Sequence, residues 1–138
     1  MKRIVNIYIP VSGNIAMTVW PFIFVRRDLK HHYNADVDRH EHIHALQQIE
    51  MLIVGAVLSV VLWLIGCGWW SLLALLLFYW WYLIEFVIKA FYYGDNNVAF
   101  RYLAFEREAY NHMYDATYLK NRKHFAWVKY IGFLPRRN

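Results

Sequence analysis

A long apolar block between Met51 and Tyr93 constrains the fold of this chain more than any other feature. Its only charged side chains are Glu85 and Lys89. Residues 51–68 would be about 27 Å long as a helix, which is near the lower limit for a membrane span. A second apolar run follows at once, so the block predicts a transmembrane helical hairpin. A buried hairpin in a soluble protein is the alternative interpretation.

The turn and the ends of this hairpin indicate how it would lie in a bilayer. Cys67 and Gly68 form the break between the two apolar runs, and Trp69 and Trp70 beside them favour the far membrane interface. The turn carries no charge, whereas basic residues precede and follow the hairpin. The positive-inside rule then predicts that both chain ends lie on the cytoplasmic side of the inner membrane.

The composition outside the block fits a lipid bilayer as the partner. The net charge is +5, and basic residues that flank an apolar centre suit anionic lipid headgroups. The sequence carries no nucleic-acid-binding motif, so nucleic acid is not expected as a partner. A single cysteine excludes an internal disulfide, which fits a reducing compartment.

The N-terminal region, residues 1–27, predicts a small β-hairpin. Residues 4–9 and 16–25 are rich in β-branched and aromatic side chains, and each run predicts a strand. Residues 12–14 favour a turn between the two strands. Pro21 would confine the second strand to a sheet edge or a bulge. Such an edge is a candidate docking site for an extended peptide.

The stretch RHEHIHALQQ occupies residues 39–48, just before the apolar block. Its helix-forming flanks predict a helix, so His40 and His44 lie one turn apart on one face and His42 points elsewhere. Two imidazoles at this spacing can bind one zinc ion. Glu41 beside the first histidine can then act as general base toward a metal-bound water. The alternative interpretation is a histidine-rich, solvated helix end.

A catalytic zinc needs a third protein ligand, and two glutamates beyond the apolar block are candidates. A helix is predicted from about Val98 to Lys120, and a helical projection separates the two side chains. Glu106 is the lone carboxylate on an otherwise apolar or aromatic face, whereas Glu108 points to the polar side. An ionised carboxylate on a buried face requires compensation, which a metal ion would supply. A buried salt bridge to Lys89 or an arginine is the alternative.

Several further polar residues are candidates for supporting roles. Gln47 and Gln48 continue the side of the helix that carries the histidine pair, where they either bind a substrate backbone or cap the helix at its entry into the bilayer. Glu85 is either a functional residue or the i,i+4 partner of Lys89. The possible donors to an oxyanion are Tyr110, His112 and Tyr114.

These motifs together resemble known membrane peptidases. HEHIH, followed after an apolar hairpin by EREA, is similar to the membrane gluzincins of the HtpX heat-shock protease and CAAX prenyl protease type. More closely, HEHIHALQQ, WYLIEF, FEREAY and YL-x-x-R resemble a family of small membrane metallopeptidases over residues 19–130. The resemblance implies zinc binding by His40, His44 and Glu106, with Glu41 as the catalytic base. Tyr110 stands where those enzymes have an aspartate that usually orients a ligand histidine.

The sequence thus predicts a mainly α-helical membrane protein with a single domain. Its expected parts are the β-hairpin 1–27, an active-site helix and transmembrane hairpin 36–93, and a third-ligand helix with a basic tail 98–138. The predicted activity is zinc-dependent hydrolysis of a peptide or membrane-protein substrate at the cytoplasmic membrane face, with one zinc ion. The alternatives are a non-catalytic metal-binding or scaffold protein in the membrane, and a metal-free helical-hairpin membrane protein.

Overall fold

The structure is a computed structural model that describes residues 1–10 and 14–135. It is mainly helical with a small N-terminal sheet, as the sequence predicts. The strands are β1 (Lys2–Asn6), β2 (Ala16–Val19) and β3 (Phe22–Arg26), and the helices are α1 (Ala35–Leu64), α2 (Leu77–Tyr93), α3 (Asn96–Arg101), α4 (Ala104–His112) and α5 (Tyr118–Asn121). Segments of 3₁₀ helix cover Lys30–His32, Gly68–Leu76 and Ala126–Tyr130.

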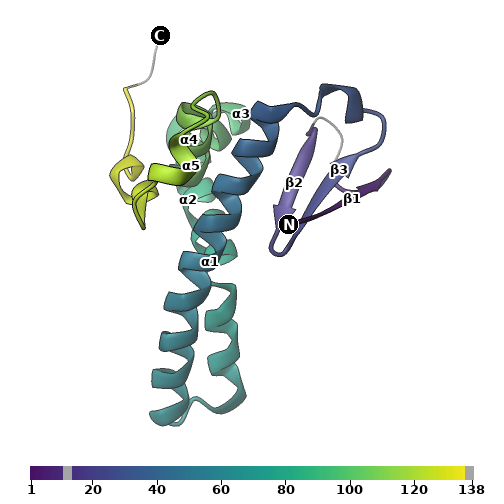
Figure 1. The fold of residues 1–138 in the computed structure, drawn as a ribbon. Coiled ribbons are helices and arrows are strands. Elements are labelled where there is room, and N and C mark those ends of the chain that lie inside the picture. Colours follow the sequence, from purple (N-terminus) through teal and green to yellow (C-terminus); the bar gives the residue numbers. More distant parts are fainter. Residues whose placement is uncertain (11–13, 136–138) are drawn as a thin grey trace.

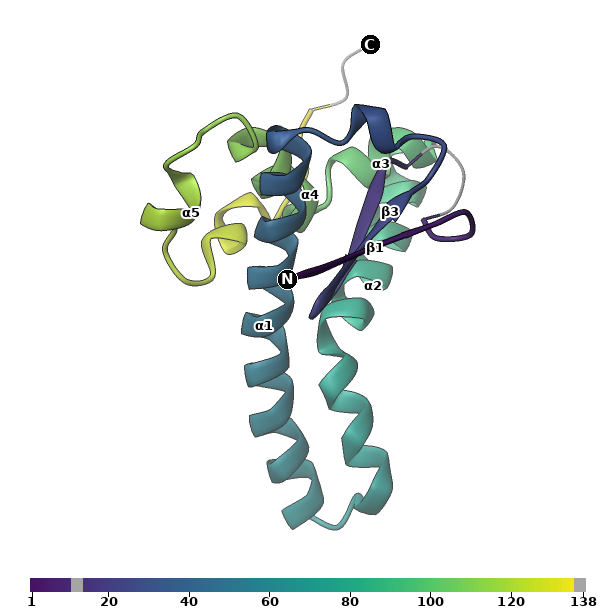
Figure 2. The same cartoon turned by 45° about the vertical axis from the view of Figure 1, so that its right-hand side comes forward.

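The helix α1 forms one arm of a long stalk, and the 3₁₀ segment Gly68–Leu76 followed by α2 forms the antiparallel second arm (Figure 1). The sheet lies beside the upper part of this stalk, and α4 and α5 lie on another side of α1 (Figures 1 and 2). No other element covers the lower part in either view. The segments Ala35–Leu64 and Gly68–Tyr93 are both long and apolar enough to cross a membrane.

The lower stalk is held by close backbone packing. Gly55 and Ser59 are buried on α1 at four-residue spacing, which places them on one face of the helix. A Cβ atom at Gly55 would lie 2.2 Å from the backbone carbonyl oxygen of Ala74 in the 3₁₀ segment. Only glycine therefore allows the two arms of the stalk to approach this closely.

The sheet differs from the predicted two-stranded hairpin. The strand expected over residues 16–25 is itself a hairpin, in which β2 and β3 pair antiparallel with Val19 opposite Phe22. Trp20 and Pro21 form the turn between them. Proline suits a turn because its φ is fixed and its nitrogen donates no hydrogen bond. The strand β1 pairs parallel with β3, so the strand order is β1-β3-β2 and β2 is an edge strand. The turn expected at residues 12–14 lies largely outside the described residues.

The single helix expected from Val98 to Lys120 is instead divided into α3, α4 and α5. Leu103 is extended, with φ −58° and ψ 142°, between α3 and α4. Two charged side chains of α2 stabilise this break. Lys89 donates to the Tyr102 carbonyl, and Glu85 accepts a hydrogen bond of 2.9 Å from the Ala104 N–H. The break gives α4 its own direction, independent of α3.

An aromatic core anchors α4 against the stalk. Phe105 is fully buried, stacks on Phe78 of α2 at 4.5 Å between ring centroids, and lies 4.6 Å from the ring of Trp127. Met51 and Ala104 complete this core cluster. Since Phe105 precedes Glu106, the core fixes the start of the helix that carries the predicted third ligand.

Candidate metal centre

Three nitrogen and oxygen donors converge between α1 and α4. Asn34 caps the N-terminus of α1 by accepting from the N–H groups of Asp36 and Val37, and His40 and His44 follow one turn apart. The two Nε2 atoms of these histidines are 3.0 Å apart. The Glu106 carboxylate lies 3.4 Å from each of them, through Oε2 to His40 and Oε1 to His44.

The two separations of 3.4 Å between Glu106 and the histidines fit a tetrahedral zinc ion, and the histidine pair lies somewhat closer together. Bonds of 2.0–2.1 Å at tetrahedral angles set neighbouring donors about 3.3–3.4 Å apart. The donor set of two imidazoles and one carboxylate is the set of catalytic zinc sites that keep a fourth position open. Among the described residues, no lysine or arginine forms the alternative salt bridge with Glu106, and the acidic partner of Lys89 is Glu85.

Within the part of the chain that the structure describes, burial leaves two polar atoms of this cluster without a hydrogen-bond partner. His40, His44 and Glu106 are only 8%, 8% and 4% exposed. Among the described residues, Glu106 Oε2 and His40 Nδ1 have no hydrogen-bond partner. Tyr82 of α2 donates to Glu106 Oε1 at 2.9 Å. A buried polar atom without a partner costs free energy, and a bound cation would remove that cost at Oε2.

The electrostatics of Glu106 favour a ligand in its charged form. Burial alone would raise the pKa of Glu106, but the facing imidazoles of His44 and His40 outweigh burial and hold the pKa well below its usual value. The carboxylate is therefore ionised at neutral pH and ready to bind a metal ion.

Glu41 is held at the same site by the edge strand of the sheet. The Thr18 hydroxyl of β2 lies 2.7 Å from Glu41 Oε2, to which it donates, and 3.0 Å from the Glu41 backbone carbonyl. Glu41 and the three donors line one cleft of about 440 Å³. The apolar wall of that cleft includes Val37, Phe78, Tyr79, Phe100 and Met113.

The two glutamines take different partners. Gln48 binds the end of β2, where its Nε2 donates to the Thr18 carbonyl at 2.8 Å and its Oε1 accepts from the Trp20 N–H at 2.7 Å. Gln47 faces the metal centre instead, with Oε1 2.8 Å from His44 Nδ1. Gln48 therefore positions the sheet, and Gln47 contacts a candidate ligand.

The other predicted supporting residues lie at different distances from the cleft. Tyr110 lines it, with its ring centroid 4.6 Å from that of His40. His112 is not among the cleft-lining residues; it lies 2.8 Å from the Tyr130 hydroxyl and stacks on Tyr118. Tyr114 is largely exposed and also lies outside the lining. Glu85 forms the i,i+4 pair with Lys89 that the sequence allowed, at 2.6 Å.

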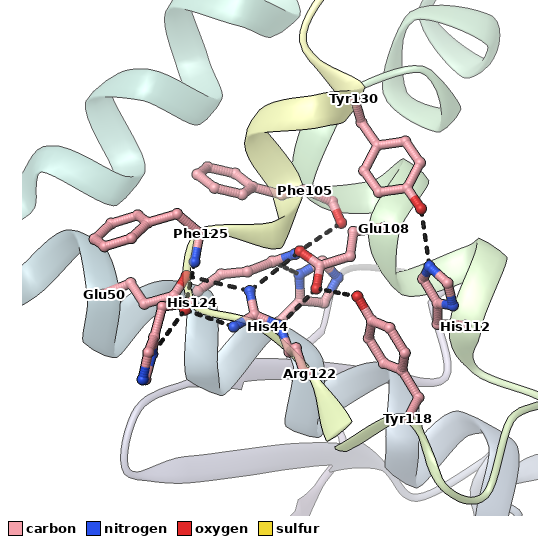
Figure 3. A network of polar contacts seen from close by, with 11 residues as sticks. His44, Glu50, Phe105, Glu108, His112, Tyr118, Arg122, His124, Phe125 and Tyr130 are labelled. Atoms are coloured by element: carbon pink, nitrogen blue, oxygen red, sulfur yellow. Dashed lines mark hydrogen bonds and ion pairs between the residues drawn. The ribbon is translucent and has the colours of Figure 1, made fainter. Parts of the chain in front are cut away.

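The environment of Glu108 differs from the one that the helical projection predicts. Glu108 was expected on the polar side of its helix, yet its side chain is fully buried. The reason is that the chain beyond α4 returns over this face and brings Arg122 to it, with Nε 2.5 Å from Glu108 Oε1. Arg122 also contacts Glu50 of α1 at 2.5 Å (Figure 3). A projection of one isolated helix carries no information on a segment that covers it later. The YL-x-x-R stretch, which ends in Arg122, was the available signal.

Comparison with known proteins adds no relative to this description. No match was found among protein-family models, curated proteins or solved structures.

Proposed function

We propose that this chain is a zinc-dependent peptidase that works at a membrane surface. The observation that carries the proposal is the convergence of His40, His44 and Glu106 in one cleft with Glu41. The separations of 3.4 Å between Glu106 and each histidine match tetrahedral zinc, and the cleft leaves room for a substrate beside the donors. The resemblance of the sequence motifs to membrane gluzincins supports the same assignment.

The residues around the donors suit peptide hydrolysis. A bound zinc ion would supply Lewis-acid polarisation of a carbonyl and a water with a lowered pKa. Glu41 would accept the proton from the attacking water and pass it to the leaving amine. The Thr18 hydroxyl holds the Glu41 carboxylate in the cleft for this task.

Tyr110 is the best-placed donor to the developing oxyanion. It lines the cleft beside His40, whereas His112 and Tyr114 do not line it. Burial and the Glu106 carboxylate raise the pKa of Tyr110 above its ordinary value. The hydroxyl therefore stays protonated and can donate a hydrogen bond.

The free edge of β2 suits an extended substrate. The Arg26 N–H donates to the Ile15 carbonyl at 3.0 Å, which makes this opposite pair a hydrogen-bonded one. Because such pairs alternate in an antiparallel ladder, the backbone groups of Ala16 and Thr18 point away from β3. The Thr18 carbonyl is bound by Gln48, and the groups before it can pair with a peptide beside Glu41.

The exposed apolar side chains of the stalk support a membrane location. Large side chains such as Leu64, Trp69, Trp70 and Phe91 are between 78% and 85% exposed. An apolar surface of this kind is stable in lipid and a liability in water. The opposing interpretation, a buried hairpin in a soluble protein, requires a cover that none of the described residues provides over the lower stalk.

The length of α1 sets the depth of the metal centre. The helix ends at Leu64, so its uncharged part from Met51 is about 21 Å long, which is less than the ~30 Å hydrocarbon core. A helix needs about 20 residues to cross the bilayer fully. If the crossing segment ends at Leu64, it begins at Ala45. His44 would then lie at the membrane surface. The charged flanks and uncharged turn orient this surface toward the cytoplasm.

The test compares wild type with Glu41→Gln and His42→Gln after purification in detergent. His42 is the matched control because it lies between the two ligands, with Nδ1 2.7 Å from the Asp38 carbonyl. We expect about one zinc ion per chain in all three proteins. Cleavage of an unfolded protein and of a membrane-anchored peptide should occur in wild type and His42→Gln only.

Two other outcomes would change the assignment. Stoichiometric zinc without cleavage in wild type would identify a non-catalytic metal-binding protein. No zinc in wild type would refute both metal-dependent interpretations and favour a metal-free hairpin protein.

A further inference from the structure

A chain of buried polar groups leads from His44 to the C-terminal part of the molecule. His44 Nδ1 lies 2.8 Å from Gln47 Oε1. The Gln47 amide nitrogen donates to the Phe105 carbonyl at 3.1 Å and to Glu108 Oε2 at 3.0 Å. Gln47 is fully buried, so these contacts are shielded from water. Apart from His44, none of these residues belongs to the three-donor cluster.

The partners of Gln47 determine which way its amide points. A carbonyl and a carboxylate can only accept hydrogen bonds, so the NH₂ group must face Phe105 and Glu108. The amide oxygen must then face His44, and it can only accept. His44 therefore donates from Nδ1, which leaves Nε2 as the ring nitrogen that faces Glu106 and can bind a metal ion. The tautomer that a metal ligand needs is thus fixed by the hydrogen-bond network.

Glu108 is itself held from the far side. Arg122 contacts both of its oxygens, with Nε 2.5 Å from Oε1 and a terminal nitrogen 3.2 Å from Oε2, and Tyr118 donates to Oε1 at 2.9 Å (Figure 3). Arg122 also binds Glu50, through separate contacts of 2.5 Å and 3.1 Å. The side chains of Glu108, Arg122 and Glu50 are at most 7% exposed.

We propose that Glu108 and Arg122 are positioning residues that act through Gln47 to hold His44 as an Nε2 zinc ligand. The inference rests on the proposed zinc site and adds a structural role for the segment that follows α4. It also explains how the site functions without an aspartate at the Tyr110 position. Tyr110 contacts His40 by its ring, and the orienting contact to His44 comes from its own helix.

The size of the effect follows from comparable outer contacts. Loss of the group that orients a ligand histidine typically costs ten- to a hundredfold in metal affinity. Gln47→Met keeps the length of the side chain but removes the acceptor, so we expect about a tenfold or larger loss of zinc affinity. Glu108→Gln removes the charge that holds Arg122 and should cost several-fold.

Glu50→Gln is the matched control. It breaks the other ion pair of Arg122, which among the described residues involves no group in contact with the three donors, while Arg122 keeps both contacts to Glu108. We expect it to lower thermal stability at least as much as Glu108→Gln but to leave zinc affinity within about twofold of wild type. Stability and metal affinity are thereby separated.

The experiment measures zinc dissociation constants by competition with a chelator, on full-length protein in detergent. A second measurement needs no variant: ¹⁵N NMR of histidine in the zinc-loaded wild type reports which ring nitrogen of His44 is protonated. We expect the NMR spectrum to show a proton on Nδ1 of His44. A third measurement replaces zinc by cobalt, and we expect the visible spectrum of the cobalt-loaded Gln47→Met protein to differ from that of the cobalt-loaded wild type.

Three results would overturn the inference. They are coordination of His44 through Nδ1, unchanged zinc affinity in Gln47→Met, and equal losses of affinity in Glu50→Gln and Glu108→Gln. In each case wild type still binds zinc, so the proposed function stands. If wild type binds no zinc, both proposals fail together.

Discussion

Replacing Thr18 by valine tests how the sheet contributes to chemistry at the helix. Valine has nearly the same shape as threonine but lacks the hydroxyl that donates to Glu41 Oε2 at 2.7 Å. Thr18 is only 6% exposed, so water cannot readily replace the lost donor. Glu41 would then be free to leave the orientation in which it serves as the base.

The magnitude follows from that one contact. A hydrogen bond to a charged group contributes about 1.5–3 kcal/mol. If all of this stabilisation orients Glu41, kcat/KM falls about ten- to 150-fold, since about 1.4 kcal/mol corresponds to a factor of ten. The second contact of the hydroxyl, 3.0 Å to the Glu41 carbonyl, adds little because that carbonyl lies within α1 and is already bonded along the helix.

The assay is the initial rate of cleavage of a fluorogenic peptide, with zinc per chain measured on the same samples. Zinc content should not change, because among the described residues no hydrogen bond joins Thr18 to His40, His44 or Glu106. Thr18→Ser keeps the hydroxyl and should retain most activity. Equal losses in the serine and valine variants would show that the methyl group matters rather than the hydrogen bond. Full activity in Thr18→Val would refute the role of Thr18.

Three further outcomes are expected from other parts of the molecule. Tyr82→Phe removes the donor to Glu106 Oε1 and should weaken zinc binding about tenfold, as measured by chelator competition; an unchanged affinity would show that the contact does not orient the carboxylate. Gly55→Ala should force the arms of the stalk apart by roughly 1 Å and lower the melting temperature in detergent, whereas Val57→Ala on the exposed face should not. Burial and nearby Lys129 hold the pKa of His112 below its ordinary value of 6.5, so the unfolded chain takes up a proton before the folded chain does. The neutral His112 side chain therefore contributes its full stability to the folded state above pH 6.5, and this stability is lost as the pH falls below that value. The melting temperatures of wild type and His112→Gln should diverge in that range. A constant difference between the two across the range would contradict the lowered pKa of His112.

Features that belong to one element were predictable from the sequence. The spacing of His40 and His44 is a property of a single helix, and so is the apolar setting of Glu106. These three side chains lie together in the structure because the packing of Phe105 against Phe78 brings α4 to the stalk. The apolar run after Met51 predicted a long helix in the same way.

Features that depend on a second segment were not predictable from one helix or strand. The burial of Glu108 depends on Arg122, which lies 14 residues further along the chain. The contact between Thr18 and Glu41 spans 23 residues and joins a strand to a helix. The run of β-branched residues over 16–25 gave no sign of its division into β2 and β3 except Pro21, which marks the turn rather than an edge.

Glu85 and Lys89, the two charged residues within the apolar block, help to position the distant residue Glu106. As charges in an apolar run they cost free energy unless paired, and their mutual contact of 2.6 Å meets that need. Both side chains also form hydrogen bonds with the backbone between α3 and α4. Lys89 donates to the carbonyl of Tyr102, and Glu85 accepts from the N–H of Ala104. Those backbone groups lack helical partners where the helix is interrupted. The pair thus stabilises an interruption that lets α4 start two residues before Glu106 and turn this carboxylate toward the histidines of α1.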